Sequence, residues 1–373
     1  MKENTNSYLE DLLAPADIKV NGNRPWDIQV HNPKLYQRLL AGGSVAFGEA
    51  YMDGWWDSKA IDQLVYKILD GKLYNLRFKL NKERIFNFLR ARIINLQKES
   101  RAYDIGRKHY DIGNDLYKNM LDKRMNYSCG YWEDAKDLDQ AQEAKLDLIC
   151  RKIGLKEGDR ILDIGCGWGS FAKYAAEKYK SQVVGITVSK EQVKLARELC
   201  ENLPIQIRLQ DYRDLNEKFD YIVSIGMFEH VGCKNYRNFM KVVNRNLRDK
   251  GLFLLHTIGS NRSLKSVDPW ISKYIFPNSM LPSAKQIIES SEGLFLLEDW
   301  HSFGQHYDKT LMSWHHNFNN NWNKIKDNYS QRFYRMWNYY LLSSAGAFRA
   351  NDIRLWQIVF SKNGTKGTYK SIR

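Results

Sequence analysis

One segment near the middle of the chain restricts its fold more than any other. Residues 160–169 read RILDIGCGWG, a short apolar run followed by three glycines at alternate positions. Glycine lets the backbone turn sharply and approach a ligand closely, because it has no side chain to collide with either. The residues that follow have helical spacing. We therefore predict a buried strand over Arg160–Ile164, then a ligand-binding turn and a helix.

The segments around this turn alternate between strands and helices. We predict strands at Arg160–Ile164, Gln182–Ile186, Ile205–Leu209, Tyr221–Ile225, Gly251–Thr257, Phe295–Trp300 and Leu355–Phe360. Helices are predicted at Phe171–Lys180, Lys190–Asn202 and Tyr236–Leu247. Such alternation indicates an α/β fold with a parallel, doubly wound, Rossmann-like sheet. The aromatic stretch 301–350 is predicted to be a helical insertion over the ligand-binding edge of that sheet.

A smaller, mostly helical domain is predicted to precede the sheet. A chain of 373 residues has room for about two domains. We place the N-terminal domain at residues 1–98, a linker at 99–106 and the sheet-containing domain at 107–373. Within the first of these, Leu73–Ser100 has apolar residues at helical spacing, surrounded by lysines and arginines. This basic helix fits packing on its own domain as well as it fits an anionic bilayer surface.

Charge and cysteine usage restrict the partners and the compartment. The chain has 57 Lys and Arg against 43 Asp and Glu, a net charge of +14 that attracts nucleic acid, anionic membranes or acidic substrates. The five scattered cysteines form no CxxC pair and have no zinc spacing, so we expect no metal site and a reducing compartment.

The polar N-terminus does not fit a signal peptide, and no apolar run approaches the ~18 residues of a membrane span. Any membrane contact is therefore expected to be peripheral.

The glycine turn also indicates the type of ligand. Dinucleotide enzymes have the spacing GxGxxG, whereas this turn has Asp163 before a GxGxG run and resembles the first motif of class I methyltransferases, which bind S-adenosylmethionine. Many Rossmann-like sites carry an acid for the ribose at the end of the second strand. Here Thr187 takes that position, and Gln192 can supply the hydrogen bonds instead. Asp211 and Tyr212, after the third strand, suit the amino group and the ring of adenine.

Acid–base residues stand at the ends of two neighbouring strands. Methyltransferases that act on amino groups often carry Asn or Asp, two prolines and an aromatic residue after the fourth strand, but this chain has Glu229-His230 there. His256 ends the next strand. Because adjacent parallel strands end at the same edge of the sheet, we expect Glu229 and His256 to lie together beside the sulfonium, where acid–base chemistry is needed.

Together with other segments, these motifs resemble the family of cyclopropane-fatty-acyl-phospholipid synthases and mycolic acid cyclopropane synthases, which are class I methyltransferases. The matching segments are Gly48–Asp57, Tyr110–Tyr117, Tyr127–Trp132, Asp163–Gly169, Gln210–Asp214, Gly226–Val231, Leu255–Gly259, Pro269–Pro277 and Gly346–Arg349. They extend over nearly the whole chain. The resemblance implies that residues 107–373 form a catalytic domain that uses S-adenosylmethionine to methylate a cis double bond in a phospholipid acyl chain, and then closes a cyclopropane ring.

The resemblance also implies roles for individual residues. A bound bicarbonate ion is expected to be the base, held by Cys129, Glu229, His256, Tyr307 and the backbone of Ile258. The expected cofactor-binding residues are Tyr127, Ser128, Asp163, Gly165, Cys166, Gly167, Gly169, Thr187, Gln192, Asp211 and Tyr212. The family further implies a cytoplasmic homodimer that associates peripherally with the inner face of an anionic membrane.

Three other functions are compatible with parts of the sequence. A lipid carbon methyltransferase of the same fold would leave a methyl branch instead of a ring. Methyl addition to a double bond leaves a carbocation, and the placement of water and base around it decides which product forms. A basic RNA methyltransferase would explain the charge, but no RNA-binding module is apparent, and we expect no nucleic-acid partner. A lipid carrier without catalysis would need neither the intact glycine loop nor the pair Glu229 and His256.

Overall fold

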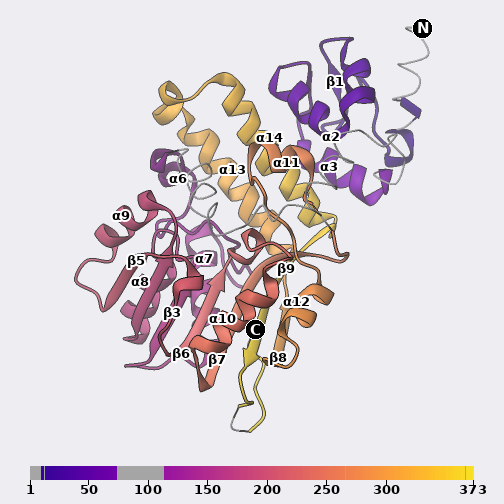
Figure 1. Ribbon diagram of the computed structural model, residues 1–373. Coiled ribbons are helices and arrows are strands. Elements are labelled where there is room, and N and C mark those ends of the chain that lie inside the picture. The colour runs from indigo at the N-terminus through magenta and orange to yellow at the C-terminus, as the bar shows by residue number, and fades with distance from the viewer. Residues whose placement is uncertain (1–9, 12, 74–112, 265, 366) are drawn as a thin grey trace. The chain divides into compact units, whose positions relative to one another are not determined.

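The structure is a computed structural model that describes residues 10–11, 13–73, 113–264, 266–365 and 367–373 (Figure 1). Its contacts divide the chain into two units. The first comprises residues 1–94, 265–277 and 307–353, and the second comprises 95–264, 278–306 and 354–373. The expected linker at 99–106 and nearly all of the basic segment 73–100 lie outside the described residues. The first unit includes late segments that the sequence-based division assigns to the catalytic domain, and that division stays a prediction.

The second unit contains a seven-stranded sheet with the order β5-β4-β3-β6-β7-β9-β8. The strands are β3 (Arg160–Ile164), β4 (Gln182–Thr187), β5 (Ile205–Leu209), β6 (Phe219–Ile225), β7 (Leu247–Ser260), β8 (Leu296–Ser302) and β9 (Ile353–Ser361). The pairs from β5 through β7 are parallel, which confirms the α/β expectation. β8 and β9 pair antiparallel, so the expectation of a wholly parallel sheet is wrong at this edge. The chain leaves β8 and re-enters β9 at the same end of the pair.

Helices follow most strands of the second unit, and three of its described helices, α7, α9 and α12, begin at side-chain caps. The helices are α6 (Asn114–Met120), α7 (Leu138–Ile153), α8 (Ser170–Tyr179), α9 (Lys190–Leu199), α10 (Tyr236–Asn246) and α12 (Ala284–Ser291). The expected helices are confirmed to within a few residues. Asp137 and Ser189 cap α7 and α9 by accepting hydrogen bonds from the backbone N–H three residues later, which satisfies donors that the first turn leaves free.

Alternate residues of the parallel strands pack on opposite faces of the sheet, as strand geometry requires. Ile161 of β3 packs with Leu146 of α7 and Phe171 of α8 in one hydrophobic cluster. Its neighbour Leu162 packs with Phe239 of α10 in another cluster. Because both faces are covered, the strands read as apolar runs, which is why they are recognisable in the sequence.

The first unit is mostly helical. Its elements are η1 (Ala14–Ala16), β1 (Gln29–Val30), α2 (Leu35–Met52), β2 (Trp56–Asp57), α3 (Ile61–Asp70), α11 (Pro269–Tyr274), α13 (His306–Ile325), η6 (Lys326–Asn328) and α14 (Gln331–Arg349). α14 packs on α2 and α3. A Cβ at Gly346 would lie 2.4 Å from Asp62 O, so this close approach of α14 to α3 requires glycine. Arg349 then donates to both Asp62 and Asp308.

The aromatic stretch 301–350 is helical over most of its length, as predicted, and its position over the edge of the sheet stays a prediction. In the described part of the chain, no helix combines the length and the apolar character that crossing a bilayer demands.

Candidate active site

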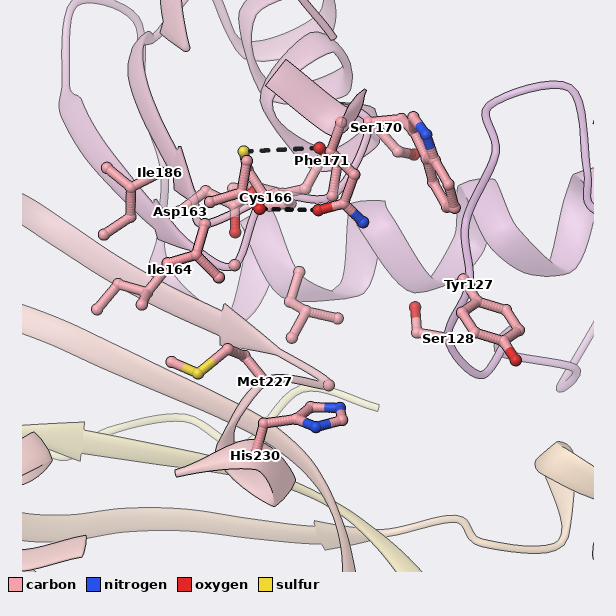
Figure 2. A pocket seen from close by; sticks show the side chains of 18 of the residues that line it. Tyr127, Ser128, Asp163, Ile164, Cys166, Ser170, Phe171, Ile186, Met227 and His230 are labelled. Carbon is pink, nitrogen blue, oxygen red and sulfur yellow. Dashed lines mark hydrogen bonds between the residues drawn. The ribbon is translucent and has the colours of Figure 1, made fainter. Parts of the chain in front are cut away.

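A cavity of about 190 Å³ opens beside the carboxyl ends of β3, β4 and β6. It is lined by every expected cofactor-binding residue except Gly169. Figure 2 shows Asp163 and Cys166 on one side of this cavity and Met227 and His230 on another, with Tyr127 and Ser128 on a separate loop. The structure therefore brings together expected cofactor-binding residues that lie as much as 85 positions apart, from Tyr127 to Tyr212, around one ligand-sized space.

The three glycines of the turn have positive φ but different tasks. Gly167 has φ +55°, and a Cβ built there would meet nothing within 4 Å, because it would point into open space. At Gly165, with φ +85°, a Cβ would lie 2.8 Å from Met227. At Gly169 it would lie 2.8 Å from Cys200 Sγ. Gly169 thus lets α8 begin close to α9, and it is Gly165 and Gly167 that present backbone to the cavity.

The second strand ends in a neutral hydrogen-bonded pair where many related sites have an acid. Thr187 Oγ1 donates to Gln192 Oε1 at 2.7 Å, and both side chains are buried. Ser189, the N-cap of α9, accepts from Gln192 N. This arrangement fixes Gln192 at the cavity wall with its amide nitrogen left as a donor for ribose hydroxyls.

The expected adenine end is shaped by Asp211 and Tyr212. The Asp211 carboxylate accepts from Arg213 N at 2.9 Å and caps the short helix η4 (Tyr212–Asp214). Tyr212 packs edge-on against Phe239 at 5.2 Å, and its buried hydroxyl has no hydrogen-bond partner among the described residues. A buried polar atom of this kind is normally satisfied, so a ligand is a reasonable acceptor or donor for it.

Several cavity residues were not predicted from the sequence. They include Asn126, Lys145, Ser170, Met227 and His230. Asn126 adjoins the Tyr127–Trp132 motif, and Met227 and His230 belong to the Gly226–Val231 motif, so closeness to a motif is the signal that could have found them. Lys145 has no such signal, because a single lysine in a helix normally faces solvent.

Glu229 follows β6 in the short helix η5 (Phe228–His230), and is buried. Its Oε1 accepts from Ile258 N at 2.6 Å, which ties this turn to the end of β7. Oε2 has no hydrogen-bond partner in the described part of the chain. Burial raises the pKa of Glu229 to about 7, although the Ile258 N–H opposes the shift. A carboxyl group with such a pKa can exchange a proton near neutral pH.

His256 lies on β7, where it pairs with Ile225 at the end of β6. Its Nδ1 is 3.3 Å from Gln357 Nε2, which suits the tautomer that carries its proton on Nε2. Nε2 is buried and lacks a hydrogen-bond partner among the residues that the structure describes. Burial lowers the pKa of His256 well below its usual range, so the ring is neutral. The site therefore holds a buried donor at His256 and a buried acceptor at Glu229, and neither has a hydrogen-bond partner within the described residues.

The remaining two residues of the expected bicarbonate set have different positions. Cys129 is buried, and its Sγ donates to Gly130 O at 3.2 Å. Tyr307 belongs to the first unit, where it stacks on Phe348 at 4.4 Å. None of the five residues of that set lines the cofactor cavity, although Ser128 and His230, next to two of them, do. Their joint binding of an ion stays a prediction.

A sequence profile, a curated relative and two solved structures point to one family. The sequence profile described as "Mycolic acid cyclopropane synthetase" matches residues 97–358. The chain is 53% identical to the cyclopropane-fatty-acyl-phospholipid synthase of Escherichia coli over 365 residues, 98% of this chain and 95% of that protein. The solved structure of a cyclopropane synthase from Mycobacterium tuberculosis has a TM-score of 0.67 and 30% identity, and the match covers 72% of this chain and 100% of that one. A mycolic acid cyclopropane synthase in complex with SAH and CTAB has a TM-score of 0.65 and 34% identity, over 70% of this chain and 98% of that one.

Proposed function

The chain belongs to the mycolic acid cyclopropane synthetase family, and we propose that it is an S-adenosylmethionine-dependent methyltransferase that forms cyclopropane rings in the unsaturated acyl chains of phospholipids. The observation that carries this proposal is the 53% identity to a cyclopropane-fatty-acyl-phospholipid synthase over 98% of the chain. The class I methyltransferase sheet supports it, with the glycine turn at the wall of a cavity and the Glu229–Ile258 contact at the ends of β6 and β7.

The reaction places two demands on the protein. The π electrons of the alkene form a bond to the methyl carbon while the C–S bond breaks, and S-adenosylhomocysteine leaves. Because an alkene is a weak nucleophile, the sulfonium must be held close to it in a dry space, which is the task of the cavity walls around Gly165, Gly167 and Gln192. Loss of a proton from the new methyl group then frees the electron pair that closes the ring, so a base is also needed.

We propose that this base is a bicarbonate ion bound between Glu229 and His256. A bicarbonate ion has acceptor oxygens for the His256 Nε2–H and an O–H for Glu229 Oε2, the two buried atoms that lack partners in the described chain. Bound there, it would supply an anionic acceptor for the methyl proton. Glu229, with a pKa of about 7, is suited to receive a proton from the ion afterwards. The neutral His256 would hold the ion by donating its Nε2–H.

The activity itself is the first expected result. Purified protein incubated with S-adenosylmethionine and vesicles of cis-unsaturated phospholipids should add one methylene per double bond, and saturated vesicles should gain none. Mass spectrometry and proton NMR of the acyl chains separate a ring from a methyl branch, since only a branch retains the full methyl group. A methyl-branched product would support the alternative carbon methyltransferase. Label that appears in RNA, with none in lipid, would contradict the proposal.

We further propose a cytoplasmic homodimer that associates peripherally with anionic membranes through the basic segment 73–100. Nearly all of that segment lies outside the described residues, so the proposal rests on its sequence. Replacing Arg84, Arg90 and Arg92 with Glu should reduce sedimentation with anionic vesicles and leave affinity for S-adenosylhomocysteine unchanged. Native binding should weaken as salt rises, because ions screen surface charges. Vesicle binding that is indifferent to both changes would contradict this role, and analytical ultracentrifugation checks the dimer.

A further inference from the structure

A buried lysine lines the cofactor cavity and has one donor to spare. Lys145 lies on α7 and is 1% exposed. Its Nζ donates to Asn126 Oδ1 at 2.9 Å and to Ser128 Oγ at 3.1 Å. An ammonium group has three N–H donors, so a third remains for another acceptor. Within the described part of the chain the lysine forms no ion pair, which is unusual for a buried charge.

A carboxylate with one oxygen that lacks a hydrogen bond among the described residues faces the same cavity. Asp163, at the end of β3, is 1% exposed, and its Oδ1 has no hydrogen-bond partner among the described residues. Burial raises the pKa of Asp163 to about 7 and lowers that of Lys145 to about 8, although the opposite charge of each group lessens the shift of the other. The charged forms of both groups would be stabilised by a ligand that brings the opposite charge to each of them.

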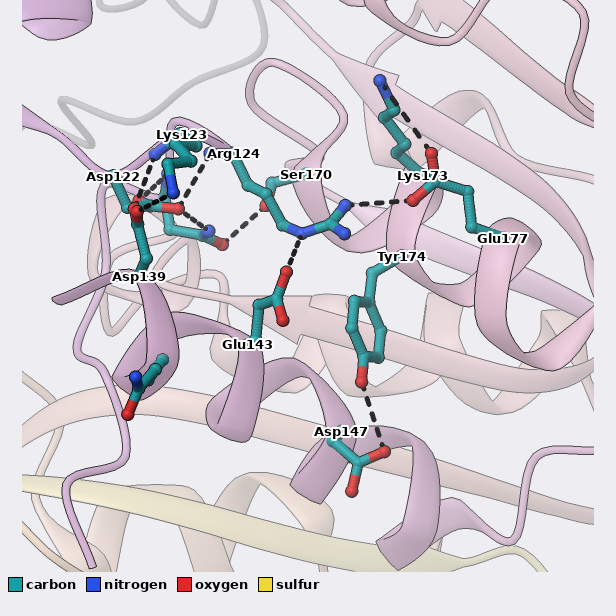
Figure 3. A network of polar contacts seen from close by, with 12 residues as sticks. Asp122, Lys123, Arg124, Asp139, Glu143, Asp147, Ser170, Lys173, Tyr174 and Glu177 are labelled. Atoms are coloured by element: carbon teal, nitrogen blue, oxygen red, sulfur yellow. Dashed lines mark hydrogen bonds and ion pairs between the residues drawn. The ribbon is translucent and has the colours of Figure 1, made fainter. Parts of the chain in front are cut away.

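The position of Lys145 is held by the loop that covers it. Asn126 donates from its backbone N and from Nδ2 to Asp122, at 2.7 and 2.8 Å. Asn126 Oδ1 accepts from Ser170 Oγ as well as from Lys145, so both of its lone pairs are used. Figure 3 shows that Arg124 of the same loop bridges to carboxylates on α7 and α8. These contacts hold the loop in place, so it cannot easily shift to bring an acceptor to the third N–H of Lys145.

We propose that Lys145 binds the α-carboxylate of the methionine part of S-adenosylmethionine, opposite Asp163 at its α-ammonium group. That part of the ligand is a zwitterion, and a cavity with one buried cation and one buried anion is complementary to it. The residues expected at ribose and adenine, Thr187 and Tyr212, leave this end of the cavity for the amino acid. The inference rests on the proposed cofactor site and adds the residue that recognises the carboxylate.

The test compares two ligands that differ only in the carboxylate. S-adenosylhomocysteine and its decarboxylated form are titrated calorimetrically into the native protein and the variants Lys145→Met and Lys152→Met. Lys152 is the matched control: it is also buried on α7, but it contacts Asp299 and His301 and does not line the cavity.

Native protein should bind S-adenosylhomocysteine about 10- to 100-fold more tightly than the decarboxylated form, as expected for a charge-assisted hydrogen bond. Lys145→Met should remove this preference by weakening only the first ligand, whereas Lys152→Met should retain it. Thermal melting checks the folding of both variants, and Lys145→Gln replaces the Met variant if that variant is unfolded.

Four results would overturn the proposal. Native protein that binds both ligands equally excludes a carboxylate contact. A Lys145 variant that weakens both ligands by the same factor shows that the lysine only holds the loop, and a variant with native affinities shows no role. Native protein that binds neither ligand would count against the proposed cofactor site, and this inference would fall with it.

Discussion

Gly167→Val should abolish cofactor binding, lowering affinity for S-adenosylhomocysteine at least about 100-fold, or roughly 2.7 kcal/mol. Two physical effects combine. Gly167 has φ +55°, which β-branched residues adopt only with strain, so the turn itself would shift. Its Cβ direction is open for 4 Å because it faces the cavity, so the valine methyl groups would occupy space that the ligand needs. Isothermal titration calorimetry measures the loss.

Gly154→Val is the matched control for backbone strain. Gly154 ends α7 with φ +67°, and a Cβ there would also meet nothing within 4 Å, but it does not line the cavity. This variant should melt at a lower temperature than native protein, by an amount similar to Gly167→Val, and should bind S-adenosylhomocysteine normally. If both variants lost affinity equally, strain and not occupancy of the cavity would be the cause, and the site assignment at Gly167 would be contradicted.

The strands and the cofactor cavity could be predicted because local sequence carries their signals. β3 has the same bounds in the structure as in the prediction, Arg160–Ile164, since an apolar run buried on both faces ends at a glycine turn. The direction of β9 could not be predicted, because an apolar run looks the same whether its strand is parallel or antiparallel to its neighbour. The pairing of Leu296 with Ser361 and of Ser302 with Trp356, which reveals antiparallel strands, depends on the path between them.

Lys145 shows a different limit of prediction. Its helix, α7, buries residues around most of its circumference, including Gln142, Lys145 and Lys152. A lysine between alanine and leucine gives no local indication that it is enclosed. Burial follows only when the Asp122–Asn126 loop and α8 close over the helix. The closeness of Glu229 to the end of β7 could be predicted, because adjacent parallel strands end at the same edge of the sheet. The hydrogen bond from Ile258 N to Glu229 Oε1 is visible only in the structure.

Glu229→Gln should lower turnover by about 10²–10⁴-fold, the range for loss of a group in general acid–base catalysis. Glutamine keeps the shape and can still accept from Ile258 N, but it cannot take up a proton. Affinity for S-adenosylhomocysteine should stay native, because Glu229 does not line the cofactor cavity. Single-turnover kinetics and calorimetry measure the two quantities separately. A variant that loses affinity as severely as Gly167→Val would show that Glu229 serves the cofactor site.

The pH dependence of the same variant tests the protonation state. The folded pKa of Glu229, about 7, is above the 4.5 of an unperturbed carboxyl group. Ionisation therefore opposes folding, and the native protein should lose stability as pH rises from about 5 through 7. Glu229→Gln should lose less stability than native protein over this range, because Asp163, whose pKa is also raised to about 7, still ionises there. The variant should melt no lower than native protein at pH 8. The pH dependence of turnover has the opposite direction. Only ionised Glu229 accepts a proton, so native turnover should fall as pH drops through 7.

Removal of dissolved bicarbonate distinguishes the ion from a side chain as the base. At pH 8, where Glu229 is ionised, rigorous degassing should slow the native enzyme, and added bicarbonate should restore its rate. Glu229→Gln should respond only weakly, because the ion would lose the acceptor for its O–H at Oε2. A native rate that ignores bicarbonate would mean that Glu229 takes the methyl proton directly. The neutral His256, whose pKa is far below this range, would then serve only to hold and orient the site.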